Sequence, residues 1–226
     1  MRAPFKICTV VEGNSLPVFL CNLKNAQEGS AKVELRADSI HGFEEDDIDT
    51  IRKSVSISSI FTCRHVKEGG LFSGDAKEQK AINKKAFHTS FSYVDIAIGN
   101  SLVKELDEKE RRKLLLSYHD FEATPNYIKL SVMLDRMRKE EPAIIKIATM
   151  VNSPKDVFTL ADVLKERKDK EKLIVIGMGE MGKLTRIMFP AMGSYMTYAS
   201  MEGSKMAPGL MTRKQMESIY ATITKS

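Results

Sequence analysis

The sequence predicts an α/β protein folded as a single (β/α)8 barrel, also called a TIM barrel. Short apolar segments typical of strands alternate with helical segments along the whole chain. About eight such pairs fit into the 226 residues, which leaves little room for a second domain. We therefore expect residues 1–226 to form one catalytic barrel domain rather than an open doubly wound sheet.

The expected strands are short and bounded by polar or turn-forming residues. They span residues 6–11, 31–36, 56–64, 93–98, 114–118, 143–148, 172–176 and 193–198. The expected helices lie between them, at 15–28, 46–54, 75–89, 101–112, 126–139, 153–167, 182–189 and 212–224. Ser153-Pro154 supplies an N-cap and a first-turn proline, and Thr124-Pro125 is expected to do the same.

Charged residues near the carboxyl ends of several strands predict where the functional site lies. Residues two apart on a strand face the same way, so Glu34 and Arg36 share one face. The same spacing places Arg64, Asp95, His119 and Lys146 on the corresponding faces of their strands. Active sites of (β/α)8 barrels lie at the carboxyl ends of the strands. An edge-strand ion pair would explain Glu34 and Arg36 alone, but not the repeated pattern.

Lys146 and His119 are the residues whose chemistry points to an enzyme. Lys146 lies in the apolar run Ile-Ile-Lys-Ile-Ala, where burial disfavours a charged amine. An uncharged amine attacks carbonyl carbons to form a Schiff base, and a histidine transfers the protons that follow. Taken singly, the lysine fits a side chain that reaches the rim of the sheet, and the histidine fits a structural role. Their pairing favours catalysis.

Composition restricts the kinds of ligand and the cellular compartment that we expect for this protein. The net charge is +5 and the pI near 9.0, which suits an anionic substrate. Basic clusters are mixed with acidic residues and are not interleaved with aromatics, so we expect no nucleic-acid partner. No apolar run approaches a membrane span, and we expect no membrane partner. Three cysteines at no metal-ligand spacing predict reduced thiols in a cytoplasmic protein.

Two glycine-containing stretches allow more than one interpretation. Residues 177–182 match G-x-G-x-x-G, but they follow the seventh strand of eight. A dinucleotide fingerprint normally opens the first unit, so a tight turn that positions Arg186 is the favoured interpretation. Residues 202–210 form a loop of small residues after the last strand, which suits a mobile lid as well as a plain linker.

Several segments, in order along nearly the whole chain, resemble one enzyme family. They are VELRAD (33–38), FTCRHVKEGG (61–70), YVDIAI (93–98), SYHDFEATP (117–125), IIKIATM (144–150), GMGEMGKLTRI (177–187) and GSYMTYA with the following APG (193–209). Together they are similar to the type I 3-dehydroquinate dehydratases of the shikimate pathway, which leads to aromatic amino acids. S-x-H-D-F…T-P followed by K-I-A-x-M is the most specific part of the match.

The resemblance implies a mechanism and a role for each site residue. Lys146 is expected to form the Schiff base, His119 to transfer protons, and Glu68 to orient the histidine. Substrate binding is expected of Glu34, Arg36, Arg64 and Arg186, the last as the carboxylate clamp. The implied substrate is a small anionic hydroxy-keto acid, and the implied enzyme is a carbon–oxygen lyase, often a homodimer. No metal and no dissociable cofactor is expected, because the imine serves as the electron sink.

Three positions depart from the family pattern and leave alternatives open. Ala97 stands where the family commonly has Glu, and the lid carries Met206 and Leu210 where the family has Ser and Gln. Ser204 is the candidate replacement for the lost lid serine. One alternative is therefore an aldolase-like Schiff-base barrel with another keto acid as substrate, or with weak activity. The other is a non-catalytic barrel that binds a metabolite or a protein partner.

Overall fold

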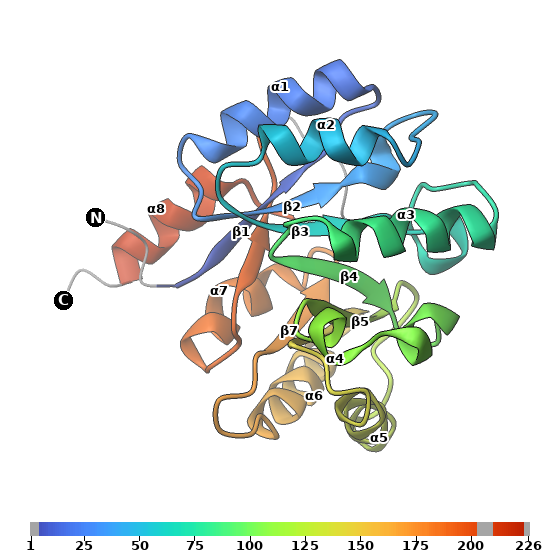
Figure 1. The fold of residues 1–226 in the computed structure, drawn as a ribbon. Helices are drawn as coiled ribbons and strands as arrows, with labels where there is room; N and C mark the ends of the chain where they lie inside the picture. Colours follow the sequence, from blue (N-terminus) through green and yellow to red (C-terminus); the bar gives the residue numbers. More distant parts are fainter. Residues whose placement is uncertain (1–4, 203–209, 224–226) are drawn as a thin grey trace.

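The computed structural model describes residues 5–202 and 210–223, and within them the chain alternates strands and helices around one parallel sheet (Figure 1). The strands are β1 (Ile7–Val11), β2 (Lys32–Arg36), β3 (Ser58–Thr62), β4 (Tyr93–Ala97), β5 (Leu114–Asp120), β6 (Ile144–Met150), β7 (Leu173–Met178) and β8 (Thr197–Ala199). The helices are α1 (Leu16–Gln27), α2 (Asp47–Ser54), α3 (Ala76–His88), α4 (Glu108–Arg111), α5 (Tyr127–Arg138), α6 (Pro154–Lys165), α7 (Lys183–Ala191) and α8 (Arg213–Ile223).

The sheet is a nearly closed (β/α)8 barrel, as the sequence predicts. Its strand order is β7-β6-β5-β4-β3-β2-β1-β8, with parallel pairing throughout. The remaining gap lies between β7 and β8. The Tyr195 backbone N–H bridges it by donating to the Leu173 carbonyl at 2.8 Å. Figure 1 shows the helices on the outside of the strands.

The two faces of the strands bury different kinds of residue. On β2, Val33 and Leu35 point outward into the large apolar layer between the strands and the helices. A smaller apolar cluster fills the barrel interior and includes Val10 on β1, Ile174 and Ile176 on β7. The inward positions nearer the carboxyl ends include the buried charged side chains of Glu34, Asp95 and Lys146, on the faces that the two-residue spacing predicts.

Local capping explains where several helices begin. The Asp75 carboxylate accepts hydrogen bonds from the backbone N–H groups of Lys77 and Glu78, which starts α3. Pro154 occupies the first turn of α6 after Ser153, as expected. The expectation for Thr124-Pro125 is wrong, because Asn126 caps α5 by accepting from the Lys129 N–H at 3.0 Å.

The helix expected at residues 101–112 is instead two short elements. A 3-10 helix covers Ser101–Glu105, and α4 covers only Glu108–Arg111. Asp107 interrupts the helix because its carboxylate caps the Glu110 N–H at 2.8 Å, while Glu110 caps the Asp107 N–H in return. Short 3-10 helices also cover Ala37–Ser39 and Val66–Glu68, directly after β2 and near the end of β3.

The glycine stretch after β7 is a tight turn, in agreement with the favoured interpretation. A side chain at Gly182 would collide with the backbone of Gly177, since a Cβ there would lie 2.4 Å from the Gly177 carbonyl carbon. Gly179 has φ +79°, a left-handed conformation that suits glycine. Over the described residues, no helix has the length and apolar character needed to cross a bilayer.

Candidate active site

A cavity of about 150 Å³ opens at the carboxyl ends of the strands and gathers six of the predicted site residues. Those six are Glu34, Arg36, Arg64, His119, Lys146 and Arg186. They come from four different strands or the segments that follow them, and from α7. The cavity is also lined by residues that the sequence alone did not single out, among them Thr62, Phe121 and Tyr198.

Lys146 lies at the centre of the cavity floor. It occupies the third position of β6, opposite Ser117 of β5, and only 7% of its surface is exposed. Its Nζ lies 3.4 Å from the Glu34 carboxylate and 3.4 Å from the Asp95 carboxylate. The nearest charged groups are therefore carboxylates that compensate the ammonium charge, a feature that the apolar sequence context does not predict.

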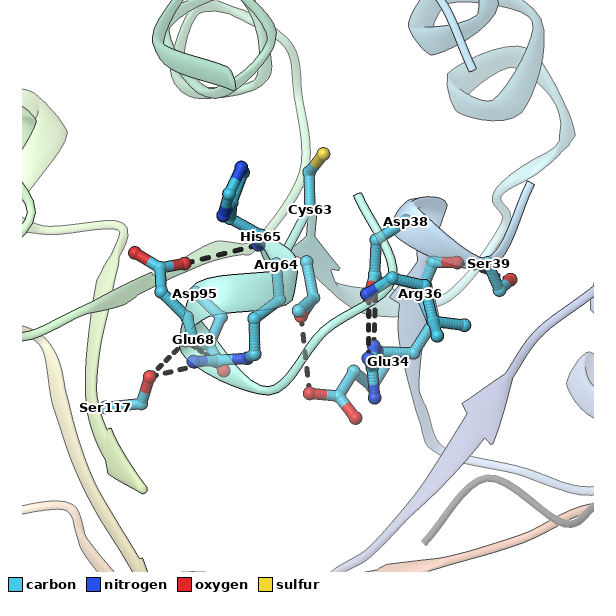
Figure 2. Close-up of polar contacts among 12 residues, drawn as sticks. Glu34, Arg36, Asp38, Ser39, Cys63, Arg64, His65, Glu68, Asp95 and Ser117 are labelled. Atoms are coloured by element: carbon cyan, nitrogen blue, oxygen red, sulfur yellow. Dashed lines mark hydrogen bonds and ion pairs between the residues drawn. The ribbon is translucent and has the colours of Figure 1, made fainter. Parts of the chain in front are cut away.

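The side chain of Asp95 links this lysine to Arg64. Its Oδ1 accepts from the Arg64 guanidinium at 2.7 Å and from the Ser117 hydroxyl at 2.6 Å (Figure 2). Burial alone would raise the pKa of the Asp95 carboxyl, but the two cations and the serine hold it below its usual value. Asp95 thus stays ionised and fixes both cations in position.

Arg36 and Glu34 are held on the opposite side of the cavity (Figure 2). The Arg36 guanidinium forms a two-pronged ion pair with Asp38, with N–O distances of 2.9 and 2.7 Å. The 3-10 helix Ala37–Ser39 that follows β2 carries this aspartate. Glu34 accepts from the Thr62 hydroxyl at 3.3 Å. Each charged group on the floor therefore has a fixed orientation before any ligand enters.

His119 projects from the end of β5 toward the same space as Lys146. Ser117 pairs with Lys146 across the sheet, and His119 is two residues further along the same face. Strand geometry then separates the Cα atoms of His119 and Lys146 by about 8 Å, close enough for their side chains to act on one ligand. The imidazole is stacked on Phe121, with ring centroids 5.8 Å apart.

The imidazole is neutral at neutral pH. Burial, followed by the charges of Arg64 and Lys146, holds the pKa of His119 well below its usual value. Its Nδ1 is buried and has no hydrogen-bond partner among the described residues. A neutral imidazole has a free lone pair that can accept a proton, and the neighbouring cations favour the release of that proton afterwards.

Glu68 does not form the expected contact with His119. Its carboxylate accepts from the His65 backbone N–H at 3.3 Å, from the Gln79 amide at 3.1 Å and from the Asn100 amide at 3.4 Å. No hydrogen bond joins it to the imidazole within the part of the chain that the structure describes. Glu68 instead closes the turn after β3 (Figure 2).

The two glycines after Glu68 connect that turn to the cavity. Gly69 has φ +76°, and a side chain there would overlap the Phe121 ring. A Cβ at Gly70 would collide with the Arg64 carbonyl. The Glu-Gly-Gly sequence therefore lets the turn pack directly beneath Phe121, on which His119 is stacked.

Arg186 reaches the cavity from α7. Only 4% of its surface is exposed, and its guanidinium forms no ion pair among the described residues. Burial lowers the pKa of Arg186 to about 10. The Tyr220 hydroxyl donates to the Arg186 carbonyl at 2.8 Å and so ties α8 to this segment.

Only some of the positions that depart from the family pattern lie within the described residues. Ser204 and Met206 lie outside the described residues. Leu210 is described and lines the cavity, so this position adds an apolar group to it. Ala97 is half-buried at the end of β4 and lies outside the set of cavity-lining residues. Among residues 5–202 and 210–223, no group of three or more His, Cys, Asp or Glu side chains is arranged to hold a metal ion.

Comparison with known proteins assigns this arrangement to a family. Residues 7–226 match the model of the type I 3-dehydroquinase family. The chain is 34% identical over 220 residues to a 3-dehydroquinate dehydratase of Coxiella burnetii, covering 97% of this chain and 94% of that protein. It is 35% identical over 219 residues to the Methanocaldococcus jannaschii 3-dehydroquinate dehydratase, covering 95% and 97%.

Solved structures agree with this assignment. The 3-dehydroquinate dehydratase of Aquifex aeolicus superposes with a TM-score of 0.81 at 26% identity, over 98% of this chain and all of that one. The type I enzyme of Clostridium difficile, at 24% identity, shares the fold with a TM-score of 0.85 over 98% and 93% of the two chains. The chain therefore belongs to the type I 3-dehydroquinase family.

Proposed function

We propose that this protein is a 3-dehydroquinate dehydratase, a carbon–oxygen lyase that eliminates water through a Schiff base on Lys146. The observation that carries the proposal is the placement of Lys146 and His119 in one cavity, on adjacent strands of the barrel. Membership of the family supplies the substrate class, because the relatives named above are 3-dehydroquinate dehydratases.

The first stage is formation of the imine. The Lys146 amine adds to the C3 ketone of 3-dehydroquinate, and loss of water gives an iminium group. The amine attacks in its unprotonated form. The neutral imidazole of His119 lines the same cavity and can accept a proton at this stage. Once formed, the iminium charge lies between the Glu34 and Asp95 carboxylates, which stabilise it.

The second stage is elimination. The iminium group withdraws electrons and acidifies the adjacent C2–H, which His119 removes. The C1 hydroxyl then leaves as water, with the proton returned by His119, and 3-dehydroshikimate remains joined to Lys146. Attack of water on this imine frees the product and the amine. Atoms balance, since the water consumed in hydrolysis equals the water released when the imine formed.

The charged residues around Lys146 bind the substrate. Arg186 has no protein partner in the described structure, so we assign the substrate carboxylate to it. Glu34, Arg36 and Arg64 already have partners and present their remaining groups to the cavity, which suits hydroxyl recognition. Ser204 remains a further candidate from the lid.

Glu68 is best regarded as a positioning residue. Its carboxylate fixes the turn that carries Gly69, and Phe121 packs on that glycine. The His119 ring is stacked on Phe121, so the turn orients the imidazole through an aromatic contact. A Glu68→Gln variant keeps two acceptor contacts, which makes it the conservative comparison for Glu68→Ala.

The proposal is tested by trapping. Borohydride added during turnover of 3-dehydroquinate reduces the imine, and the protein is expected to gain the mass of one bound ligand on Lys146. Peptide mass mapping locates the adduct. Absence of both turnover and adduct at saturating 3-dehydroquinate would refute the proposal.

The pH profile offers a second measurement. Because the pKa of His119 lies well below its usual value, the imidazole stays unprotonated as the pH falls from neutral into the mildly acidic range. We expect the acid limb of kcat/KM, which reports the free enzyme, to lie clearly below about pH 6.5, the ordinary histidine value. An acid limb centred at or above that value would contradict the neutral-histidine assignment.

We also infer a homodimer in the cytoplasm that has neither a nucleic-acid nor a membrane partner. The last helix does not supply an apolar contact face, since Met216 is buried in the core. Exposed apolar side chains gather instead on α5 and α6, where Ile128, Val132 and Phe158 are 71%, 65% and 70% exposed. The free cysteines suit a reducing compartment.

A further inference from the structure

Among the described residues, three buried polar groups of the cavity-lining side chains have no hydrogen-bond partner. They are His119 Nδ1, Arg186 Nε and the Tyr198 hydroxyl, and each belongs to a residue that lines the cavity. Polar atoms buried in a protein are nearly always paired, because an unpaired one loses its hydration without replacement. Their concentration here indicates that a polar ligand completes these contacts. His119 and Arg186 already have roles in the proposed reaction, whereas Tyr198 has none.

Tyr198 is placed to contact a ligand held on Lys146. It is the second residue of β8, which pairs with β1, and only 3% of its surface is exposed. The Lys146 Nζ lies 4.4 Å from the centre of its ring, so the aromatic face covers the amine. The phenol oxygen lies at the far end of this ring, and a buried tyrosine hydroxyl normally finds a partner.

Tyr198 and Arg186 line the same cavity. One is an unpaired buried cation, and the other is an unpaired hydrogen-bond donor. A carboxylate can accept hydrogen bonds from both groups at once, and its negative charge complements the Arg186 cation. A hydroxyl or a ketone carries no such charge.

We propose that the Tyr198 hydroxyl donates a hydrogen bond to the same substrate carboxylate that Arg186 binds. Tyr198 is then a specificity-determining residue supplied by the barrel itself. This inference rests on the proposed dehydratase function and adds a residue to its substrate site. It also accounts for the apolar Leu210. If Tyr198 on β8 binds the carboxylate, a polar side chain at position 210 is not required to bind it.

The test is Tyr198→Phe, which removes only the oxygen. Loss of a hydrogen bond to a charged group lowers binding about tenfold to a hundredfold. We expect kcat/KM for 3-dehydroquinate to fall by that factor, mainly through a higher KM. We expect the melting temperature to stay equal or rise, because the unpaired hydroxyl is gone. A tyrosine with a purely structural role predicts the opposite pair of results, a lower melting temperature with unchanged kinetics, and would overturn the proposal.

A matched control and a second ligand sharpen the result. Tyr195→Phe removes the hydroxyl of a residue that precedes β8. This residue lies at the end of the barrel opposite the cavity, and its ring faces Lys6. It is expected to leave kcat/KM unchanged. An analogue with a neutral amide in place of the carboxylate should lose much less affinity on Tyr198→Phe than 3-dehydroquinate does. Equal losses would refute the carboxylate assignment.

The two proposals fail in different ways. Borohydride trapping of 3-dehydroquinate on Lys146 of the unmodified protein tests the dehydratase function alone. If trapping succeeds and Tyr198→Phe turns over normally, only the role of Tyr198 is wrong. If trapping fails, the dehydratase function is wrong whatever Tyr198 does.

Discussion

Lys146→Met is expected to abolish turnover of 3-dehydroquinate, with kcat lowered by at least about 10⁴-fold, because the covalent nucleophile is lost. Methionine keeps the length of the side chain and fits the apolar strand. Borohydride should then add no ligand mass to the protein at any substrate concentration. The measurement is steady-state turnover together with intact-protein mass after reduction. Residual activity within tenfold of the unmodified enzyme would show that another group carries the chemistry.

The same substitution also has a structural consequence. It leaves the Glu34 and Asp95 carboxylates near each other without the ammonium group between them. Removing one partner of a buried ion pair costs about 3–5 kcal/mol of unfolding free energy. Adding Glu34→Gln to Lys146→Met should restore much of that stability without restoring activity. Chemical denaturation of the two single variants and the double variant measures this coupling.

His119→Ala is expected to lower kcat by about 10²- to 10⁴-fold, the range typical of a lost general acid–base group. The lysine remains, so borohydride should still trap a ligand on Lys146. The trapped adduct should be heavier than that of the unmodified enzyme by one water, because elimination is blocked after the imine forms. Mass spectrometry of the reduced protein distinguishes the two adducts.

His88→Ala provides the matched control for the histidine variant. The His88 side chain is 72% exposed on α3, outside the cavity, and its Nε2 lies 3.6 Å from the Glu110 carboxylate. We expect its kinetics to match those of the unmodified enzyme. If His119→Ala yields the dehydrated adduct at the normal rate, His119 does not perform the elimination and the mechanism above is wrong.

The inward and outward faces of the strands were predictable because they depend on a local rule. Successive side chains on a strand alternate in direction, so the positions of Glu34, Lys146 and His119 followed from counting by two. Closure into a barrel then brings the carboxyl ends of all parallel strands together. The same reasoning predicted Arg64 at the mouth, whereas Arg186 was expected there from the tight turn before α7 and from the family resemblance; both line the cavity.

The two-residue spacing also predicted Asp95 at the mouth, but it did not predict which polar groups pair inside the cavity. Asp95 pairs with Arg64 and Lys146, which lie 31 and 51 positions away in sequence. Asp38 holds Arg36 through a 3-10 turn that gave no clear apolar pattern. Tyr198 looked like an ordinary strand residue, and only the structure shows its ring against Lys146 and its hydroxyl without a partner among the described residues.

The sequence by itself determined the barrel, its inner face, and the presence of an amine and an imidazole at one end, because alternation and strand order are encoded residue by residue. Only the tertiary structure decided which charges pair, that Glu68 supports a turn instead of contacting His119, and which groups remain free for a ligand. Pairing depends on ångström-scale distances between residues far apart in the chain, and those distances exist only once the barrel is formed.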